Sequence, residues 1–173
     1  QAVDLANKLQ ALQAAGDHVI SVGDYNAFDV NDGYVDVMGL IKGTEVPASQ
    51  VTRWAPSPVA PALFDLLDLA PATQRYSFLF DGNAQELDHI LASTDLHPNA
   101  IGYGRVNADF PESLRADATR PERLSDHDPI VGYFSLPDID NTAPELTMPG
   151  PFSVEANTFG GALVTYVATA TDA

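Results

Sequence analysis

The carboxylate of Asp88 stands inside an apolar strand. The surrounding residues of "LDHIL", positions 87–91, include the leucine and isoleucine side chains of a buried strand. A carboxylate that leaves water needs a partner that carries charge or donates hydrogen bonds. Any fold open to this chain must therefore bring a polar group from elsewhere in the sequence against Asp88.

One source of such a group is the segment "LSDHDP", where Asp126 and His127 precede the apolar residues 130–136. A carboxylate that holds an imidazole fixes its tautomer and supports its charged form, which is the arrangement of a general acid–base pair. We expect His127 to pair with Asp88 across adjacent strands. Asp126 offers an oxygen ligand of the kind that Mg²⁺ or Mn²⁺ prefers.

A second polar group follows the short β-branched run at residues 19–22. Asp24 and Asn26 come directly after this run in "VISVGDYNAF". Both side chains suit a plain turn, because they bond nearby backbone readily. The alternative is a ligand site at the end of the strand, where open α/β sheets place their ligands.

The periodicity of the first unit is mixed. Leucines at helical spacing predict a helix over residues 1–15 that stops at Gly16, and residues 19–22 then predict a buried strand of the parallel type. Helix followed by strand is typical of the α/β class, here α/β (α+β). Two further helices are expected, in "DGYVDVMGLIKG" (32–43) and in "PALFDLLDLA" (61–70).

The later part of this unit has strand character. Residues 76–80 alternate, Asp81-Gly82 is a hairpin signal, and residues 87–92 are the expected return strand. Residues 95–124 show no clear period and are expected to form a long loop.

The composition changes after residue 136. Residues 137–143 read as a linker, and residues 144–173 are rich in Val and Thr, with strand alternation at 164–169. We expect domains at 1–136 and 144–173. The second is too short to bury a core of its own.

The charge balance restricts the partners of this chain. It carries 24 acidic and 8 basic residues among 173, for a net charge of −16, and it lacks cysteine. A protein that holds DNA by many phosphate contacts needs a basic face. This chain can supply one only locally, from Arg105, Arg115, Arg120 and Arg123. Bound cations would have to provide much of the positive charge at a phosphate. No apolar run is long enough to span a membrane.

Three separated motifs carry a family resemblance. "GDYNAF", "RYSF…LDHILAS" and "SDHDP", in this order, resemble the second half of the endonuclease/exonuclease/phosphatase superfamily, the fold of deoxyribonuclease I. "DGYVDVMGLIKG", "RYSFLFDGNAQELDHIL" and "NADFPES" resemble its large secreted bacterial nucleases. The resemblance implies that residues 1–136 are the second half of a four-layer αββα sandwich. The tail resembles the start of a hyalin-type (HYR) immunoglobulin-like repeat, which would be an incomplete β-sandwich segment.

The same resemblance implies roles for single residues. Asp24 would contact the attacking water and a metal ion, and Asn26 would bind phosphate or orient that water. Asp126 would be a metal ligand, His127 the active-site histidine, and Asp88 its hydrogen-bonding partner. We also expect Arg105 to bind substrate. His89 corresponds to no fixed role in the family.

The function that the resemblance implies is a metal-dependent phosphodiester hydrolase, an extracellular or cell-surface nuclease. It would act on DNA, with RNA as a further substrate, and use Mg²⁺ or Mn²⁺, with Ca²⁺ as another option. A phosphatase or phospholipase of the same superfamily and a non-catalytic extracellular binding fragment are the alternatives.

The family also places an asparagine and a glutamate metal ligand in its first half, which has no counterpart in this chain. We therefore expect the fragment alone to be inactive, and to aggregate or to pair with another chain that carries the first half.

Overall fold

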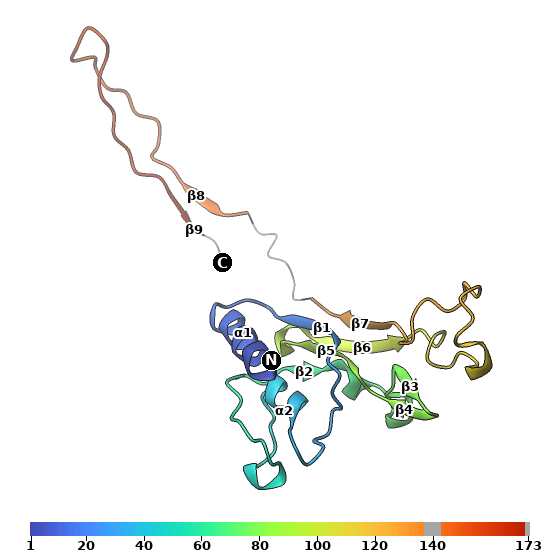
Figure 1. Ribbon diagram of the computed structural model, residues 1–173. Helices are drawn as coiled ribbons and strands as arrows, with labels where there is room; N and C mark the ends of the chain where they lie inside the picture. The colour runs from blue at the N-terminus through green and yellow to red at the C-terminus, as the bar shows by residue number, and fades with distance from the viewer. Residues whose placement is uncertain (137–142, 172–173) are drawn as a thin grey trace. The chain divides into compact units, whose positions relative to one another are not determined.

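The computed structural model describes residues 1–136 and 143–171. The chain divides into two compact units, Gln1–Pro137 and Asp138–Ala173, which are described separately here (Figure 1). The first unit is a mixed α/β structure with few helices and small antiparallel sheets. Most of the predicted linker, residues 137–142, lies outside the described residues.

The N-terminal helix α1 (Ala2–Ala14) confirms the prediction from leucine spacing. Ala6 and Leu9 are buried, and Leu5 and Leu12 pack against the same core. Two residues beyond the helix, Gly16 takes a left-handed φ of 86°, which glycine adopts without steric cost.

The central sheet has the strand order β1-β5-β2 and is antiparallel throughout. Its strands are β1 (Ile20–Asp24), β2 (Phe64–Asp65) and β5 (Asp88–Ala92). Strand β1 confirms the strand predicted at residues 19–22, but the predicted parallel type is wrong, and so is the predicted burial at Ile20 and Val22. Strand β1 lies at the end of the strand order, and much of its apolar surface is open: Ile20 is 48% and Val22 65% exposed.

The two faces of this sheet have different coverings, because successive side chains point to opposite sides. On one face, Leu91 packs with Leu9 of α1 and with Ile41 of helix α2 (Val37–Lys42). On the other face, Ile90 and Ala92 join a second apolar cluster. The site described below lies on the side of Ile90 and Ala92.

The second cluster includes residues of a two-stranded sheet, β6 (Pro98–Tyr103) and β7 (Ile130–Phe134). A Cβ added at Gly132 would lie 2.6 Å from Leu66 Cδ2, so this sheet approaches the centre closely. The expectation of a loop throughout 95–124 is wrong for β6, whose residues lack a clear alternation but gain their ladder from β7. Strand β7 agrees with the strand predicted over 130–136, except at its last two residues.

The predicted hairpin at Asp81-Gly82 is present, but its return strand is not the predicted one. Strand β3 (Phe78–Phe80) pairs with β4 (Asn83–Gln85). Both turn residues have positive φ, 48° and 79°, as a tight two-residue hairpin requires. The two-residue turn sets Phe80 opposite Asn83, so the pairing is complete at Gln85. Strand β5 then joins the central sheet instead.

Of the two other predicted helices, one is confirmed. Helix α2 (Val37–Lys42) begins at Asp36, which accepts a hydrogen bond from Gly39 N, and ends at Gly43 in the left-handed conformation. The helix predicted over residues 61–70 is wrong. Phe64 and Asp65 pair with β5, and only the single 3₁₀ turn Leu66–Leu69 follows. Pairing with β5 outweighs the local helical pattern.

The second unit holds one antiparallel pair, β8 (Glu145–Thr147) and β9 (Thr169–Thr171). Its described residues are exposed except Gly161 and Ala162, which are half-buried. This agrees with the expectation that the tail buries no core. The predicted strand alternation over 164–169 is not realised before Thr169, since β9 begins there. Among the described residues of the chain, no helix is long and apolar enough to cross a membrane.

Candidate functional site

The register of the central sheet separates the two neighbours Asp88 and His89. Asp24 lies directly opposite Asp88 in the β1–β5 ladder, so their side chains share one face. His89 points to the opposite face, where its ring packs edge-on against Tyr25. The alternation of side chains along β5 thus places Asp88 on one face of the sheet and His89 on the other.

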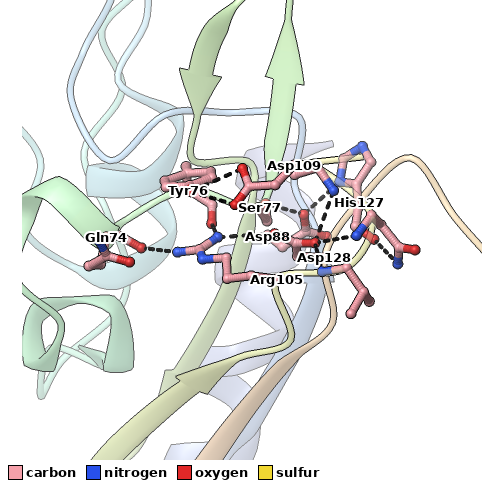
Figure 2. Close-up of polar contacts among 11 residues, drawn as sticks. Gln74, Tyr76, Ser77, Asp88, Arg105, Asp109, His127 and Asp128 are labelled. Carbon is pink, nitrogen blue, oxygen red and sulfur yellow. Dashed lines mark hydrogen bonds and ion pairs between the residues drawn. The ribbon is translucent and has the colours of Figure 1, made fainter. Parts of the chain in front are cut away.

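Asp88 accepts two hydrogen bonds on one carboxylate oxygen (Figure 2). His127 Nδ1 lies 2.6 Å from Asp88 Oδ2, and the hydroxyl of the buried Ser77 donates to the same oxygen. The structure therefore brings together Asp88 and His127, as the sequence predicts. His127 lies in the bend before β7 and not in a strand, however, so the pair does not span neighbouring strands of one ladder.

The imidazole of His127 is fixed in orientation as well as in position. The ring of Phe78 stacks on it, with centroids 4.7 Å apart and an interplanar angle of 25°. Since Nδ1 faces Asp88, Nε2 is the nitrogen left to meet a substrate; it has no hydrogen-bond partner among the described residues. The His127 side chain remains 20% exposed, so this edge is accessible.

The charges around His127 favour its protonated form. Partial burial opposes a charged imidazole, but the hydrogen bond that His127 donates to Asp88 and the negative charges of Asp88, Asp24 and Asp126 outweigh it. The pKa of His127 is therefore raised above its ordinary value. This environment therefore favours an imidazolium that can donate from Nε2.

Asp128, which the sequence analysis passed over, anchors the segment that carries His127. It is 3% exposed, and its Oδ1 accepts the backbone N–H groups of Val106, Asn107 and Ala108 at 3.2, 2.8 and 2.9 Å. The Asn107 amide in turn donates to the His127 carbonyl at 2.7 Å. A carboxylate that follows a site histidine by one residue is a signal that could have been noticed.

Asp24 and Asn26 form a turn at the end of β1. Asn26 donates its backbone N–H to Asp24 Oδ1 at 2.8 Å and its side-chain amide to Oδ2 at 3.2 Å. Asn26 itself adopts a positive φ of 49°. The turn and the site interpretations are therefore compatible, because the two side chains bond each other beside Asp88.

A pocket of about 630 Å³ opens next to this turn. Its wall includes the polar pair Asp24 and Asn26, and its apolar part includes Leu5, Val22 and Ile41. A ligand in this pocket would contact both a carboxylate–amide pair and a hydrocarbon surface.

The acidic side chains do not complete a metal site by themselves. Within residues 1–136 and 143–171, no group of three or more His, Asp or Glu side chains is placed to hold a metal ion. Both oxygens of Asp24 face Asn26, and Asp126 is exposed, with Ser125 Oγ 3.5 Å away. Asp24 and Asp126 are near enough to His127 to affect its pKa, but they do not converge with a third donor.

Arg105 is engaged with the protein itself (Figure 2). Its terminal nitrogens donate to the carbonyls of Tyr76 and Gln74 and, at 3.1 Å, to Asp128. Its guanidinium also lies 3.7 Å from the centroid of the Tyr76 ring. These contacts tie the turn after β6 to the segment before β3, and they leave the predicted role in substrate binding without support.

A second polar network lies on the helix-covered face of the sheet. His89 Nδ1 lies 2.8 Å from Asp65 Oδ2, and Nε2 lies 2.9 Å from the Ala27 carbonyl. Burial disfavours charge on His89, but the hydrogen bond and charge of Asp65 outweigh it and raise its pKa. Lys42 adds an ion pair with Asp29 and lies 3.9 Å from Asp65. This network accounts for His89 as a buried structural residue.

Comparisons with protein-family models, with curated proteins and with solved structures found no match, so the chemistry of the site rests on its own geometry.

Proposed function

We propose that this chain carries part of the catalytic site of a metal-dependent phosphodiester hydrolase, most simply an extracellular nuclease that acts on DNA and RNA. The observation that supports the proposal is the Asp88–His127 pair, with Ser77 beneath it and Asp24 opposite Asp88 in the sheet. The resemblance of "GDYNAF", "LDHILAS" and "SDHDP" to the deoxyribonuclease I superfamily adds to it.

In this proposal His127 is the proton donor, and Asn26 and Asp24 position the phosphate and the water. His127, held by Asp88 through Nδ1, donates a proton or a hydrogen bond from Nε2 to a phosphoryl or leaving-group oxygen. The Asn26 amide and the Asp24 carboxylate position phosphate and water at the end of β1. The raised pKa of His127 suits the donating role, because it favours the protonated imidazole that donates the proton.

The proposed cation, Mg²⁺ or Mn²⁺ with Ca²⁺ as another option, would supply positive charge that this acidic chain lacks. Asp24 and Asp126 are the ligands proposed within the chain. They do not form a complete donor set among the described residues, so no step is assigned to the cation here. In the proposed assembly, a first half of the αββα sandwich adds the remaining ligands, in the same chain or in another.

The test compares the gene product that contains this chain with two variants and one control. His127→Ala and Asp88→Asn should each lower the rate of plasmid cleavage with Mg²⁺ by about 10²-fold or more, the usual contribution of a general acid–base group. His18→Ala, at an exposed histidine paired with Asp95, should cleave normally. Equal cleavage by all four proteins would refute the assignment.

One feature favours a second candidate, a phosphatase or phospholipase of the same superfamily. The pocket beside Asp24 and Asn26 has an apolar wall that a lipid or another small phosphate ester could contact. Hydrolysis of a soluble phosphomonoester or a phospholipid, without nicking of DNA, would select this candidate. A complete lack of metal-dependent hydrolysis by the whole gene product would select the binding fragment instead.

A further inference from the structure

Three of the eight basic residues of this acidic chain line one pocket. The pocket has a volume of about 240 Å³ and lies in the loop between β6 and β7. Its wall includes Arg115, Arg120, Arg123 and the ring of Phe110, together with one acidic residue, Asp117. We call it the arginine pocket. In a chain of net charge −16, it is a local concentration of positive charge.

Other basic side chains of the first unit are committed elsewhere. Lys42 is paired with Asp29, Arg75 with Asp68, and Arg105 with Asp128. Each of these ion pairs holds two segments of the fold together. The arginine pocket is different, because its side chains border open space.

The acidic neighbours of the pocket leave part of its charge uncompensated. Arg115 lies 3.1 Å from Glu112, and Arg120 lies 2.8 Å from Glu122, but those two carboxylates are 80% and 53% exposed. Exposed ion pairs of this kind contribute only about 0–1 kcal/mol, so a doubly charged anion can compete with them.

The contacts of Arg123 are the main support for an anion site in this pocket. Among the described residues it has no ion-pair partner, and its Nη1 donates only to the Arg115 carbonyl at 3.1 Å. Its Nε is buried without a hydrogen-bond partner. A buried donor of a cationic group that lacks an acceptor is costly, and an anion is the group that would satisfy it.

The pocket is tied to the candidate site by the chain itself. Arg123 precedes His127 by four residues, which limits their Cα separation to about 14 Å. Asn107 joins the two ends of this segment, because its side chain accepts from Leu124 N and donates to the His127 carbonyl. Successive phosphates of one DNA strand advance 3.4 Å along the axis, so a Cα separation of this size corresponds to a few nucleotides.

From these contacts we propose that the arginine pocket binds a backbone phosphate of the polynucleotide, a few nucleotides from the phosphate at His127. The inference rests on the proposed function and adds a substrate-positioning site to it. Arg123 supplies the free charge, and Arg115 and Arg120 exchange their exposed carboxylates for the phosphate oxygens. Guanidinium groups suit this role because they bind phosphate in a bidentate manner.

The first experiment requires no catalysis. Inorganic phosphate is titrated into the protein, and the arginine Nε–Hε signals are followed by NMR. The signals of Arg123 and Arg115 should move and saturate, and those of Arg53, an arginine outside the pocket, should not. Unmoved Arg123 and Arg115 signals in a folded protein would overturn the proposal. This result is independent of whether the protein cleaves DNA.

The second experiment tests the polynucleotide. A fluorescent single-stranded oligonucleotide is bound in EDTA, over a series of KCl concentrations, by the parent, Arg123→Gln and the matched control Arg53→Gln. Arg123→Gln should weaken binding several-fold and reduce the slope of log K against log[salt] by about 0.7, the value for one contact to a single strand. Arg53→Gln should match the parent. An unchanged affinity and slope in Arg123→Gln, or no binding by the parent, would contradict the proposal even if inorganic phosphate binds.

Discussion

At the scale of single residues, the chain buries carboxylates in two different ways. Asp128 is surrounded by donors from Val106, Asn107, Ala108 and Arg105. Glu86 has the opposite environment, since its Oε1 is buried without a hydrogen-bond partner. The first carboxylate organises the loop that carries the site, and the second lowers the stability of the fold at neutral pH.

Replacement of Asp128 by alanine should destabilise the first unit strongly. The variant leaves three backbone N–H groups and the Arg105 guanidinium without their acceptor, which costs about 3–5 kcal/mol for a buried charged partner. Urea denaturation measures the loss. Asp117→Ala is the matched control, because Asp117 bonds only the nearby Thr119, and a loss of similar size there would contradict the interpretation.

Glu86→Gln should stabilise the protein at pH 8 and have little effect near pH 4.5. Burial raises the pKa of Glu86 to about 7; Asp29 and Asp65 add to the increase, and His89 and Arg75 oppose it. The folded state therefore holds a proton that the unfolded state releases from pH 4.5 upward, so stability falls as pH rises toward 7.

The expected gain from Glu86→Gln at pH 8 is about 1–2 kcal/mol, after allowance for the partial exposure of the group. Thermal melts at both pH values measure it. The exposed Glu112 provides the control substitution, Glu112→Gln, which should show no such pH-dependent difference. A gain of equal size at pH 4.5 and pH 8 would exclude Glu86 ionisation as the cause.

The sequence revealed only part of the site at this scale. The Asp88–His127 pair could be predicted, because an acid in an apolar strand needs a partner and His127 was an available one. Ser77 could not, since a serine in an alternating strand has many ordinary uses, and the only signal for Asp128 was its place one residue after His127. Their roles arise from contacts between distant segments.

At the scale of elements, helix α2 depends on its two ends. Asp36 accepts from Gly39 N at the start and from Val46 N beyond the helix. Gly43 closes the helix with a φ of 85°, and a Cβ there would lie 2.4 Å from the Val59 carbonyl oxygen. The C-terminal glycine therefore serves both the backbone turn and the packing of the following loop.

Gly43→Ala should destabilise the first unit more than Gly16→Ala does. Both glycines have nearly the same φ, 85° and 86°, so both alanines carry the left-handed strain of about 1–2 kcal/mol. Only at Gly43 does the new methyl group meet backbone; nothing lies within 4 Å of a Cβ at Gly16. Chemical denaturation of the two variants isolates the clash. Equal losses of stability would show that the loop at Val59 moves aside without cost.

Local patterns were sufficient for α1, α2 and the β3–β4 turn, because leucine spacing, a closing glycine and Asp-Gly act over a few residues. They failed at residues 61–70, where pairing of Phe64 with β5 replaces a helix. They also failed at β6, whose strand character comes from its ladder with β7. The antiparallel direction of β1 depends on the distant strand β5 and has no local signal.

At the scale of the whole molecule, the first unit leaves apolar strand surface open. Ile20 and Val22 of β1 are 48% and 65% exposed, and Val131 and Tyr133 of β7 are 49% and 54% exposed. Strand β1 also ends the strand order of the central sheet. Exposed apolar strands of this kind favour association with another chain.

The double variant Val22→Thr/Val131→Thr should associate less than the parent chain. Threonine keeps the β-branched shape that strands favour and removes apolar surface. Light scattering over a concentration series should show at least a threefold higher dissociation constant for self-association. Val30→Thr is the control, because Val30 is 72% exposed but lies outside the strands. A parent that stays monomeric and soluble at every concentration would remove the basis for this prediction.

Because Asp88 and His89 point to opposite faces of the sheet, the site tolerates substitutions in β5 better than insertions or deletions. A substitution alters one side chain, but the gain or loss of a single codon just before Asp88 would reverse the face of every residue of β5. Asp88 would then turn toward the helices, and the imidazole of His89 would turn toward His127. In the loop between β6 and β7, side chains do not alternate between two faces of a sheet, and a change in loop length costs little entropy. Related sequences should therefore differ in length in that loop and keep the count of residues through β5 constant.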